Sequence, residues 1–203
     1  MPQINPWQPA ERYLKLADSV LADLIPKYGP PALAPRSDYF TVLCDSIISQ
    51  QLATKAAQAI FNRFSSYYNN HFTPEEILNT PGETLRKLGL SSRKVLYIHD
   101  LATNFYDGTL NPSAFPHMSD KELIQQLTVV KGIGVWTVHM FLIFALNRPD
   151  VLPTDDLGIR KAVMKQYNLD TLPDKMLLEN LAIPWHPWCS VACWYLWRSL
   201  ENN

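Results

Sequence analysis

One stretch of the chain, residues 127–161, constrains the fold more than any other. It reads LTVVKGIGVWTVHMFLIFALNRPDVLPTDDLGIRK, with a Gly-Ile-Gly turn, an apolar segment and two adjacent aspartates in that order. Glycines in a turn allow positive φ and let a ligand approach the backbone closely. The N-terminus of a helix that follows such a turn attracts anions, phosphate above all. The stretch therefore predicts two helices joined by a glycine hairpin, with a carboxylate at the start of the next helix.

Helical periodicity dominates the remainder of the chain, and no pair of segments alternates in the manner of paired strands. The 16 prolines lie between the periodic stretches, as expected of helices closed by Pro-containing loops. These patterns predict an all-α fold of about ten helices. The main helices are expected at residues 11–27, 39–49, 54–67, 93–106, 119–127, 134–146, 156–167 and 190–200.

The charge balance provides no general attraction to nucleic acid. The chain has 18 Lys and Arg against 19 Asp and Glu, a formal net charge of −1, so any DNA affinity must come from local clusters and backbone dipoles. A hydrophobic content of 47% excludes a disordered chain. The longest apolar run, residues 135–146, is too short to span a bilayer, and no apolar leader precedes the first helix. We expect a protein without a membrane partner, cytoplasmic, or nuclear in a eukaryote.

The three cysteines, Cys44, Cys189 and Cys193, cannot form a closed set of disulfides. An iron–sulfur cluster needs four thiolates, so none is expected. His186, Cys189 and Cys193 have a spacing that could indicate a metal site. Three ligands without a fourth favour a buried helix with incidental thiols instead.

The order of glycine hairpin, apolar helix and aspartate resembles the helix-hairpin-helix plus Gly-Pro-Asp superfamily of DNA base-excision glycosylases. The segment WHPWCSVACWYLW resembles the C-terminal helix of its 3-methyladenine glycosylase II branch, and residues 46–64 resemble a segment beside the DNA in that branch. The resemblance implies one glycosylase fold over residues 1–203, all-α, with two helical lobes and an active-site cleft between them. One lobe would span about 38–115. The other would combine about 1–37 with 116–203 and contain the helix-hairpin-helix at about 119–146.

The resemblance implies that Asp156 is the catalytic residue. A helix N-terminus favours an ionised carboxylate, and an ionised carboxylate can stabilise a sugar that becomes positive as its glycosidic bond breaks. Simple N-capping is the alternative role for an aspartate at this place. Because two aspartates are adjacent, we expect Asp155 to be the cap and Asp156 to serve the reaction.

The hairpin itself is expected to hold DNA. By resemblance, backbone N–H groups around Gly132, Gly134 and Thr137 bind a phosphate, and Lys131 contacts a phosphate with its side chain. The backbone carbonyls of the same hairpin would hold a structural Na⁺ or K⁺, and no cofactor is expected for catalysis. Those carbonyls belong to Thr128, Val130 and Ile133. A helix C-cap followed by a new helix, without a ligand, is the alternative reading of a Gly-x-Gly turn.

A base must leave the duplex stack before an enzyme can act on it, and aromatic or apolar side chains usually hold it. The resemblance places Trp197 as the ring on which the flipped base stacks, with Trp136, Met140 and Leu157 around it. Larger aromatic residues stand in the family at the positions of Met140 and Leu157, which implies a more open pocket here. Gln51 matches the wedge that fills the gap left by the flipped base. Alternatively, Gln50 and Gln51 only cap two helices.

Trp136 also indicates the type of reaction. Family members that cut the DNA strand carry a nucleophilic lysine at this position, and tryptophan has no such chemistry. The resemblance therefore implies a monofunctional hydrolase, a DNA-3-methyladenine glycosylase II type of enzyme acting as a monomer on double-stranded DNA with alkylated bases. Its products would be a released 3-methyladenine or 7-methylguanine and an abasic site. The alternatives are a lesion-recognising DNA-binding protein of the same fold with weak or no activity, and a helical scaffold unrelated to DNA.

Overall fold

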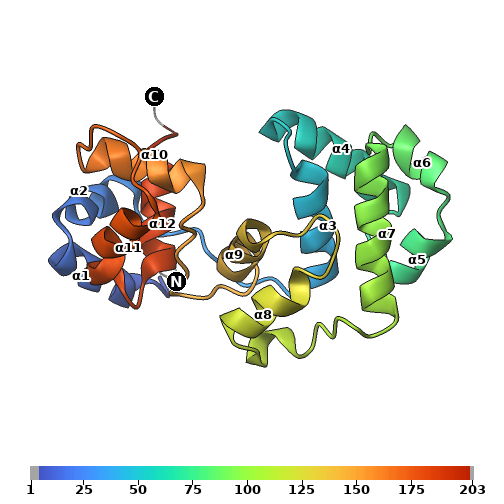
Figure 1. Ribbon diagram of the computed structural model, residues 1–203, viewed down its shortest axis with the longest axis horizontal. Helices are drawn as coiled ribbons and strands as arrows, with labels where there is room; N and C mark the ends of the chain where they lie inside the picture. Colours follow the sequence, from blue (N-terminus) through green and yellow to red (C-terminus); the bar gives the residue numbers. More distant parts are fainter. Residues whose placement is uncertain (1–4, 202–203) are drawn as a thin grey trace. The chain divides into compact units, whose positions relative to one another are not determined.

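The computed structural model describes residues 5–201, and the regular structure in this part of the chain is entirely helical (Figure 1). The all-α prediction is confirmed. No helix within the described range combines the length and apolar character needed to cross a bilayer. The helices are α1 Gln8–Ala17, α2 Ser19–Tyr28, α3 Tyr39–Ser49, α4 Thr54–Tyr67, α5 Pro74–Asn79, α6 Gly82–Lys87, α7 Ser92–Tyr106, η1 Phe115–His117, α8 Asp120–Leu127, α9 Val135–Phe144, α10 Leu157–Gln166, α11 Lys175–Ala182, η2 Ile183–Trp185 and α12 Cys189–Arg198.

The chain divides into two compact units. Arg36–Phe141 form the central unit, and the described residues up to Pro35 and from Leu142 onward form the terminal unit. The division falls inside α9, whereas the lobe boundary expected from sequence lies near residue 115. The difference arises because the hairpin is tied to the middle of the chain. The Gln50 side-chain amide donates to the Gly132 carbonyl at 2.7 Å, and the Lys131 backbone N–H donates to Asp100 at 2.9 Å.

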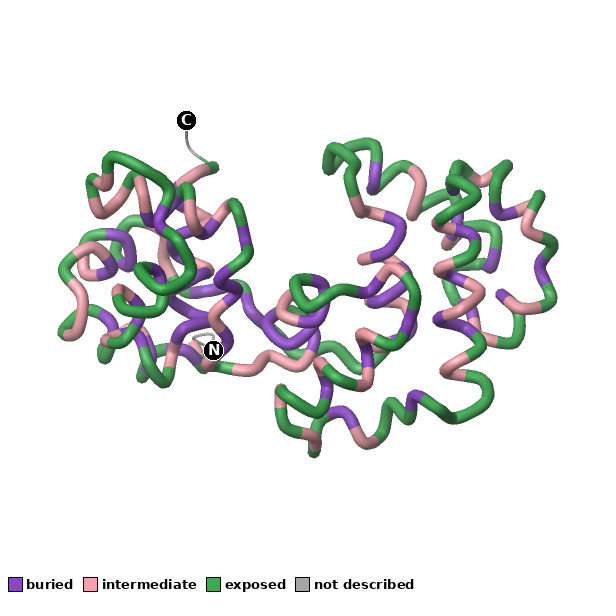
Figure 2. Tube along the Cα trace, viewed as in Figure 1, coloured by how far each residue is buried: buried purple, intermediate pink, exposed green. Residues whose placement is uncertain are grey.

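In the terminal unit, α12 is the central helix and packs against α1, α2 and α10 (Figure 1). Its residues 189–193, 195 and 196 are all buried, and it lies among the purple stretches of Figure 2. The hydroxyl of Tyr195, on α12, lies 2.9 Å from the Glu11 carboxylate and 2.8 Å from the Gly29 carbonyl. These contacts join the first helices of the chain to the last.

The helix expected over residues 11–27 is interrupted at Asp18, so that part of the prediction is wrong. Asp18 has extended backbone angles, φ −147° and ψ 120°, and caps α2 by accepting the Leu21 N–H at 3.0 Å. Its other oxygen accepts hydrogen bonds from the Tyr167 hydroxyl at 2.6 Å and the Trp185 indole N–H at 2.9 Å. The break thus places one carboxylate where it can bind two side chains from distant parts of the chain, which local periodicity does not show.

In the central unit, α7 packs against α3, α5 and α6, and α3 packs against α4. A cluster of aromatic rings fills the space between them. Phe40 contacts Phe72 and Phe105, and Phe64 contacts Phe72, with ring centroids 5.1–5.9 Å apart. Such tilted and edge-to-face pairs stabilise a core beyond the area they bury. The core makes α3 and α7 a firm support for the loops at their ends.

The three hydrogen bonds of Asp18 lead to a stability prediction. Asp18→Ala should lower the free energy of unfolding of the terminal unit by about 2–4 kcal/mol, because it removes a cap and leaves the Tyr167 hydroxyl and the Trp185 indole N–H without their acceptor. Urea unfolding followed by tryptophan fluorescence measures this, since Trp136 is the one tryptophan outside the terminal unit.

Asp174→Ala is the matched control, because Asp174 caps α11 through Leu177 N–H at 2.8 Å on the exposed surface. It should cost only about 1 kcal/mol, the typical value of a single cap. Equal losses in the two variants would contradict the role given to the Asp18 cluster.

Candidate functional site

Asp156 is the N-cap of α10 and is almost fully buried, with 7% of its surface exposed. Its Oδ1 accepts the Ile159 N–H at 2.7 Å and the Trp197 indole N–H at 2.9 Å. The expectation that Asp155 would be the cap is wrong, because Asp155 lies exposed and Asp156 makes the capping bond. The buried carboxylate is thus held at a helix N-terminus, where the helix dipole is complementary to a negative charge.

Trp197 and Leu157 lie next to this carboxylate in the same unit. The Trp197 ring is half-buried and contacts the ring of Phe144, with centroids 5.5 Å apart at an interplanar angle of 34°. Leu157 is 51% exposed and Phe144 is 41% exposed, unusual values for large apolar side chains beside a buried carboxylate. The terminal unit therefore presents an ionisable group bordered by accessible apolar and aromatic surface.

Gly158 allows Asp156 and Trp197 to approach each other. A Cβ at this position would lie 3.0 Å from Asp156 Oδ1 and 3.1 Å from both Cδ1 and Nε1 of Trp197. Any larger residue would have to displace one of the two side chains. A glycine inside the first turn of a helix lowers helix propensity, so Gly158 is the signal in the sequence that could have indicated a close contact here.

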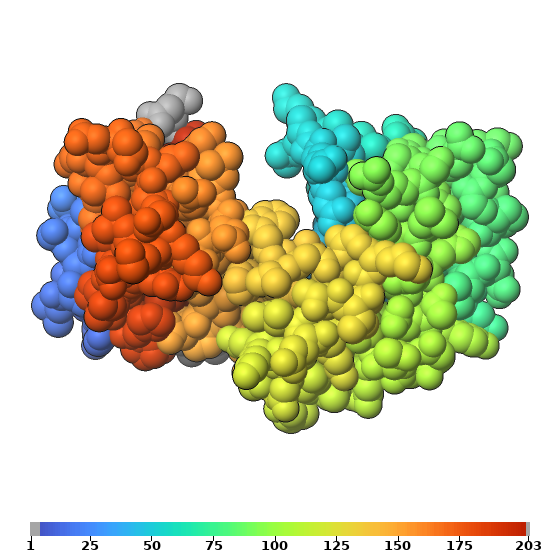
Figure 3. Space-filling view, viewed as in Figure 1, coloured from blue at the N-terminus to red at the C-terminus, as the bar shows by residue number. Residues whose placement is uncertain are grey.

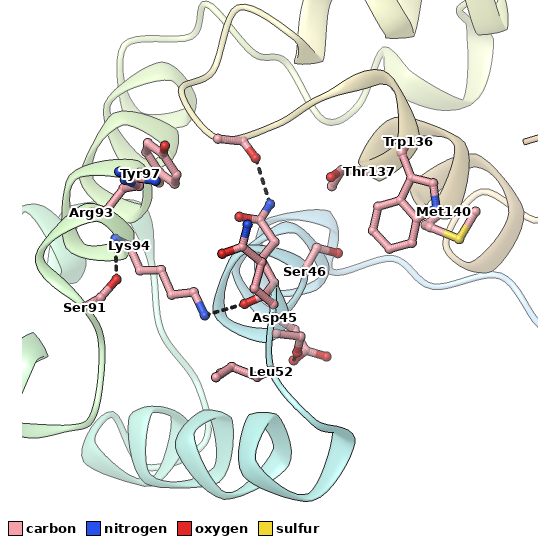
Figure 4. A pocket seen from close by; sticks show the side chains of 14 residues that line it. Asp45, Ser46, Leu52, Ser91, Arg93, Lys94, Tyr97, Trp136, Thr137 and Met140 are labelled. Carbon is pink, nitrogen blue, oxygen red and sulfur yellow. Dashed lines mark hydrogen bonds between the residues drawn. The ribbon is translucent and has the colours of Figure 1, made fainter. Parts of the chain in front are cut away.

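The central unit contains a cavity of about 960 Å³, lined by side chains of α3, α7 and α9 and by the loop between α3 and α4 (Figure 4). The predicted site residues Trp136, Thr137, Met140, Gly132 and Gln51 all line it. The other lining residues are Asp45, Ser46, Ser49, Gln50, Leu52, Ser91, Arg93, Lys94 and Tyr97.

Burial shifts the pKa values of two charged groups that line this cavity. Burial raises the pKa of Asp45, although the hydrogen bond from the Ser49 hydroxyl at 3.2 Å acts in the opposite direction. Burial lowers the pKa of Lys94. Lys94 donates to the carbonyls of Ile48 at 2.7 Å and Gln50 at 2.8 Å, so it compensates the C-terminal end of α3.

Gln50 and Gln51 differ sharply in their surroundings. The Gln50 amide is engaged with the Gly132 carbonyl, as described above, and fixes the hairpin to the loop between α3 and α4. Gln51 is exposed and has a positive φ of 58°, so its backbone turns sharply at this point. Figure 3 shows the start of α4, next in the chain, projecting from the surface of the central unit. Of the two amides, Gln51 is thus the one available to a ligand.

The hairpin follows the predicted course, and the reason for Gly132 is steric. Gly132 has φ +86°, and a Cβ there would lie 2.2 Å from Cδ2 of the Tyr97 ring. Lys131 does not extend freely into solvent, because its ammonium group lies 3.0 Å from the Asp100 carboxylate. Tyr97 and Asp100 of α7 therefore determine the position of the turn, and no local pattern in the sequence revealed either contact.

Gly134, in contrast to Gly132, has open space where a side chain would lie. A Cβ there would meet no atom within 4 Å, so the backbone before α9 is open to a ligand. The helix begins at Val135, and the N–H groups of a first turn have no acceptor within their own helix. Thr137 is buried and lies at the cavity wall. This arrangement can receive a phosphate oxygen.

The carbonyls predicted to hold an alkali cation lie in the turn between α8 and α9. Val130 and Ile133 are buried, and the Val130 carbonyl accepts the Ile133 N–H at 3.1 Å. A carbonyl has a second lone pair, and carbonyl oxygens are suitable ligands for Na⁺ or K⁺. The oxygens of Thr128, Val130 and Ile133 are therefore of the chemical type that binds such an ion, and its binding remains a prediction.

The four residues expected to form one base pocket lie in different units. Trp136 and Met140 line the cavity of the central unit, whereas Trp197 and Leu157 accompany Asp156 in the terminal unit. Trp136 is 45% exposed, as a side chain that receives a ligand should be. That all four contact a single base remains a prediction.

The structure thus combines a glycine hairpin between two helices, an open helix N-terminus and a buried carboxylate that caps a helix. These are the parts of a helix-hairpin-helix DNA repair protein. The sequence model of the HhH-GPD superfamily of base excision DNA repair proteins matches residues 44–187. This match spans most of the chain, and the chain belongs to that superfamily.

The similarity to individual proteins extends over nearly the whole length. DNA-3-methyladenine glycosylase 1 of Schizosaccharomyces pombe is 40% identical over 182 residues, which cover 88% of this chain and 80% of the relative. The solved structure of the S. pombe 3-methyladenine DNA glycosylase in complex with abasic DNA has a TM-score of 0.87 at 38% identity, covering 95% of this chain and 96% of that one. A DNA-3-methyladenine glycosidase of Bacillus halodurans has a TM-score of 0.86 at 32% identity, covering 100% and 94%.

The two hairpin glycines should respond differently to substitution. Gly132→Ala should lower the free energy of unfolding by about 2 kcal/mol or more, because the left-handed backbone disfavours alanine and the new methyl group would overlap the Tyr97 ring. Gly134→Ala should stay within about 0.5 kcal/mol of wild type, as surface substitutions without a clash do. Urea denaturation followed by circular dichroism compares the two. Equal stability of the variants would contradict the steric role of Gly132.

Proposed function

We propose that this protein is a monofunctional DNA glycosylase that hydrolyses the N-glycosidic bond of alkylated purines in double-stranded DNA. The released bases would be 3-methyladenine and 7-methylguanine, and the product is an abasic site for base-excision repair. The observation that carries the proposal is the buried Asp156 carboxylate, oriented by the Ile159 N–H and the Trp197 indole N–H at 2.7 and 2.9 Å. Membership of a base-excision repair superfamily and the names of its relatives support the same reaction.

The carboxylate would act on the sugar. As the bond from C1′ to the base nitrogen breaks, positive charge develops on the sugar ring, and a fixed negative charge stabilises that state more than the ground state. Water then adds to C1′ and loses a proton, which Asp156 would accept as the base. The two N–H donors fix the orientation of Asp156, so little reorganisation is needed when the charge appears.

The leaving base does not need to be protonated by the enzyme. An N-alkylated purine is already cationic and departs as a neutral base, so a general acid is not required. Aromatic faces attract a cation by about 1–2 kcal/mol when water is excluded, and the exposed Trp136 and half-buried Trp197 offer such faces. This preference would select cationic alkylated bases over normal ones.

The central unit would hold the DNA. The open N-terminus of α9 after Gly134 suits a phosphate, and Na⁺ or K⁺ on the hairpin carbonyls would add positive charge beside it. Gln51, exposed at a sharp turn, suits the wedge that replaces the flipped base. We further propose that the protein acts as a monomer. The abasic-DNA complex of its S. pombe relative supports DNA as the partner.

The decisive variant is Asp156→Asn. Asparagine caps helices as well as aspartate does, so the fold and DNA binding should be retained while the negative charge is lost. Release of 3-methyladenine and 7-methylguanine from alkylated DNA, separated by chromatography, should fall by about 10²–10³-fold or more, the loss typical of a single electrostatic contact in a transition state.

Asp155→Asn is the control, because it makes the same change on the exposed neighbour, and its activity should equal that of wild type. Full activity of Asp156→Asn would contradict the proposal. It would favour a different carboxylate, whereas inactivity of wild type itself on alkylated DNA would favour a lesion-binding protein without catalysis.

The monofunctional reaction leads to a separate prediction. Strand cleavage requires an amine that forms an imine with the sugar aldehyde, and Trp136 cannot provide one. Borohydride reduction during turnover should trap no protein–DNA adduct, and product strands should remain intact until treated with alkali. A trapped adduct that disappears in Lys131→Ala would show that the lysine of the hairpin had taken the nucleophile's role.

A further inference from the structure

Three chemically different side chains meet in the terminal unit, apart from Asp156. Asp150 precedes the segment that leads to α10, His186 follows η2, and Cys189 is the first residue of α12. Their ligand atoms all lie within 4.8 Å of one another. His186 Nδ1 lies 2.9 Å from both Asp150 oxygens and 3.5 Å from Cys189 Sγ.

The distances from His186 Nδ1 to the other two ligands are close to those of a tetrahedral zinc site, and the Cys189 sulfur lies within 4.8 Å of an Asp150 oxygen. Bonds of about 2.0–2.3 Å to a central Zn²⁺ place two ligand atoms about 3.3–3.6 Å apart. The sulfur–nitrogen separation of 3.5 Å already has this value. The nitrogen–oxygen separation of 2.9 Å would have to lengthen by a few tenths of an ångström, which a small rotation of the half-exposed His186 ring can supply.

The donor set also indicates the kind of metal. One thiolate, one imidazole and one carboxylate are ligands that Zn²⁺ accepts together, whereas Mg²⁺ and Ca²⁺ prefer oxygen alone. Cys193, which the sequence spacing offered as a ligand, is fully buried one helical turn further on and is not part of the cluster. Asp150, far away in the sequence, stands in its place, and spacing alone could not reveal this.

The ligands are already held in place by their surroundings. The Cys189 backbone N–H donates to Asp150 Oδ1 at 3.2 Å, which fixes the orientation of the carboxylate. The Ser190 N–H donates to the Pro149 carbonyl at 3.0 Å, and the Ser190 hydroxyl accepts the Val151 N–H at 3.0 Å. Such outer contacts orient metal ligands and raise affinity. His186 and Asp150 have side-chain exposures of 52% and 34%, so an ion can reach the buried sulfur from their side.

From this geometry we propose that Asp150, His186 and Cys189 bind one Zn²⁺ ion, with water in the remaining position. Binding replaces the thiol proton of Cys189, which is released to the buffer. The ion would fasten the start of α12 to the segment that precedes Asp156. It is a structural site and goes beyond the proposed glycosylase reaction, in which it has no part.

Cobalt provides a direct test, because Co²⁺ occupies zinc sites and absorbs light. The full-length reduced protein, freed of metal by a chelator, is titrated with Co²⁺. One equivalent should produce a near-ultraviolet thiolate-to-cobalt band and strong visible bands of tetrahedral cobalt, and one equivalent of Zn²⁺ should remove both. The thermal midpoint of unfolding should rise with Zn²⁺, because binding to the folded state stabilises it.

Matched variants identify the ligands. Cys193→Ser, a change of the same type on the same helix, should keep the thiolate band, whereas Cys189→Ser should lose it. His186→Ala alters a half-exposed side chain and tests the site even if Cys189→Ser fails to fold. It should lower Zn²⁺ affinity by about 100-fold or more, since loss of an outer-shell contact alone costs about 10–100-fold.

Two results would overturn the proposal. One is the absence of a thiolate band in wild-type protein at saturating Co²⁺. The other is unchanged Zn²⁺ affinity in His186→Ala. Neither result depends on base release, so failure of the zinc site and failure of the glycosylase proposal can be told apart.

Discussion

The hydrogen bond from the Trp197 indole N–H to Asp156 Oδ1, 2.9 Å long, is the interaction on which the rest of the site depends. It joins the end of α12 to the start of α10, and Gly158 leaves room for it, because a Cβ there would lie 3.0 Å from Asp156 Oδ1 and 3.1 Å from the Trp197 ring. The same carboxylate oxygen caps α10. A single buried group thus stabilises a helix and carries the negative charge required for the proposed reaction, and the stabilising bonds are those that fix its orientation.

Both ends of helix α12 contact the segment that carries Asp156 and hold it in place. Its C-terminal part holds Asp156 through Trp197, while Ser190 at its N-terminal end binds Pro149 and Val151, on the segment that leads to Asp156. In the central unit, the hairpin is positioned in an equivalent way by contacts with α7 and with Gln50. In both units a loop is attached to a packed helix, which is how a site keeps its geometry on irregular backbone.

Much of this could be predicted from the sequence, but only where local patterns decide the outcome. Helices α3 and α4 have the predicted bounds, because a capping aspartate and a polar loop delimit them. The helix over residues 11–27 was wrong, because Asp18 is engaged with residues almost 150 positions away. The choice between Asp155 and Asp156 as the cap also failed, since the carboxylate predicted to serve the reaction is the one that caps α10. The bond from Gln50 to Gly132 and the contact of Tyr97 with the hairpin could not be predicted, because these partners are set by tertiary packing.

The central claim is that Asp156 stabilises positive charge on the sugar, and binding of a transition-state mimic tests it most directly. Two DNA duplexes are compared, one with a cationic pyrrolidine in place of the sugar and one with its neutral tetrahydrofuran counterpart. Wild-type protein should bind the cationic duplex at least about 10²-fold more tightly, as expected of a transition-state analogue, and Asp156→Asn should lose that preference while binding the neutral duplex as before. An equal preference in both proteins would contradict the account.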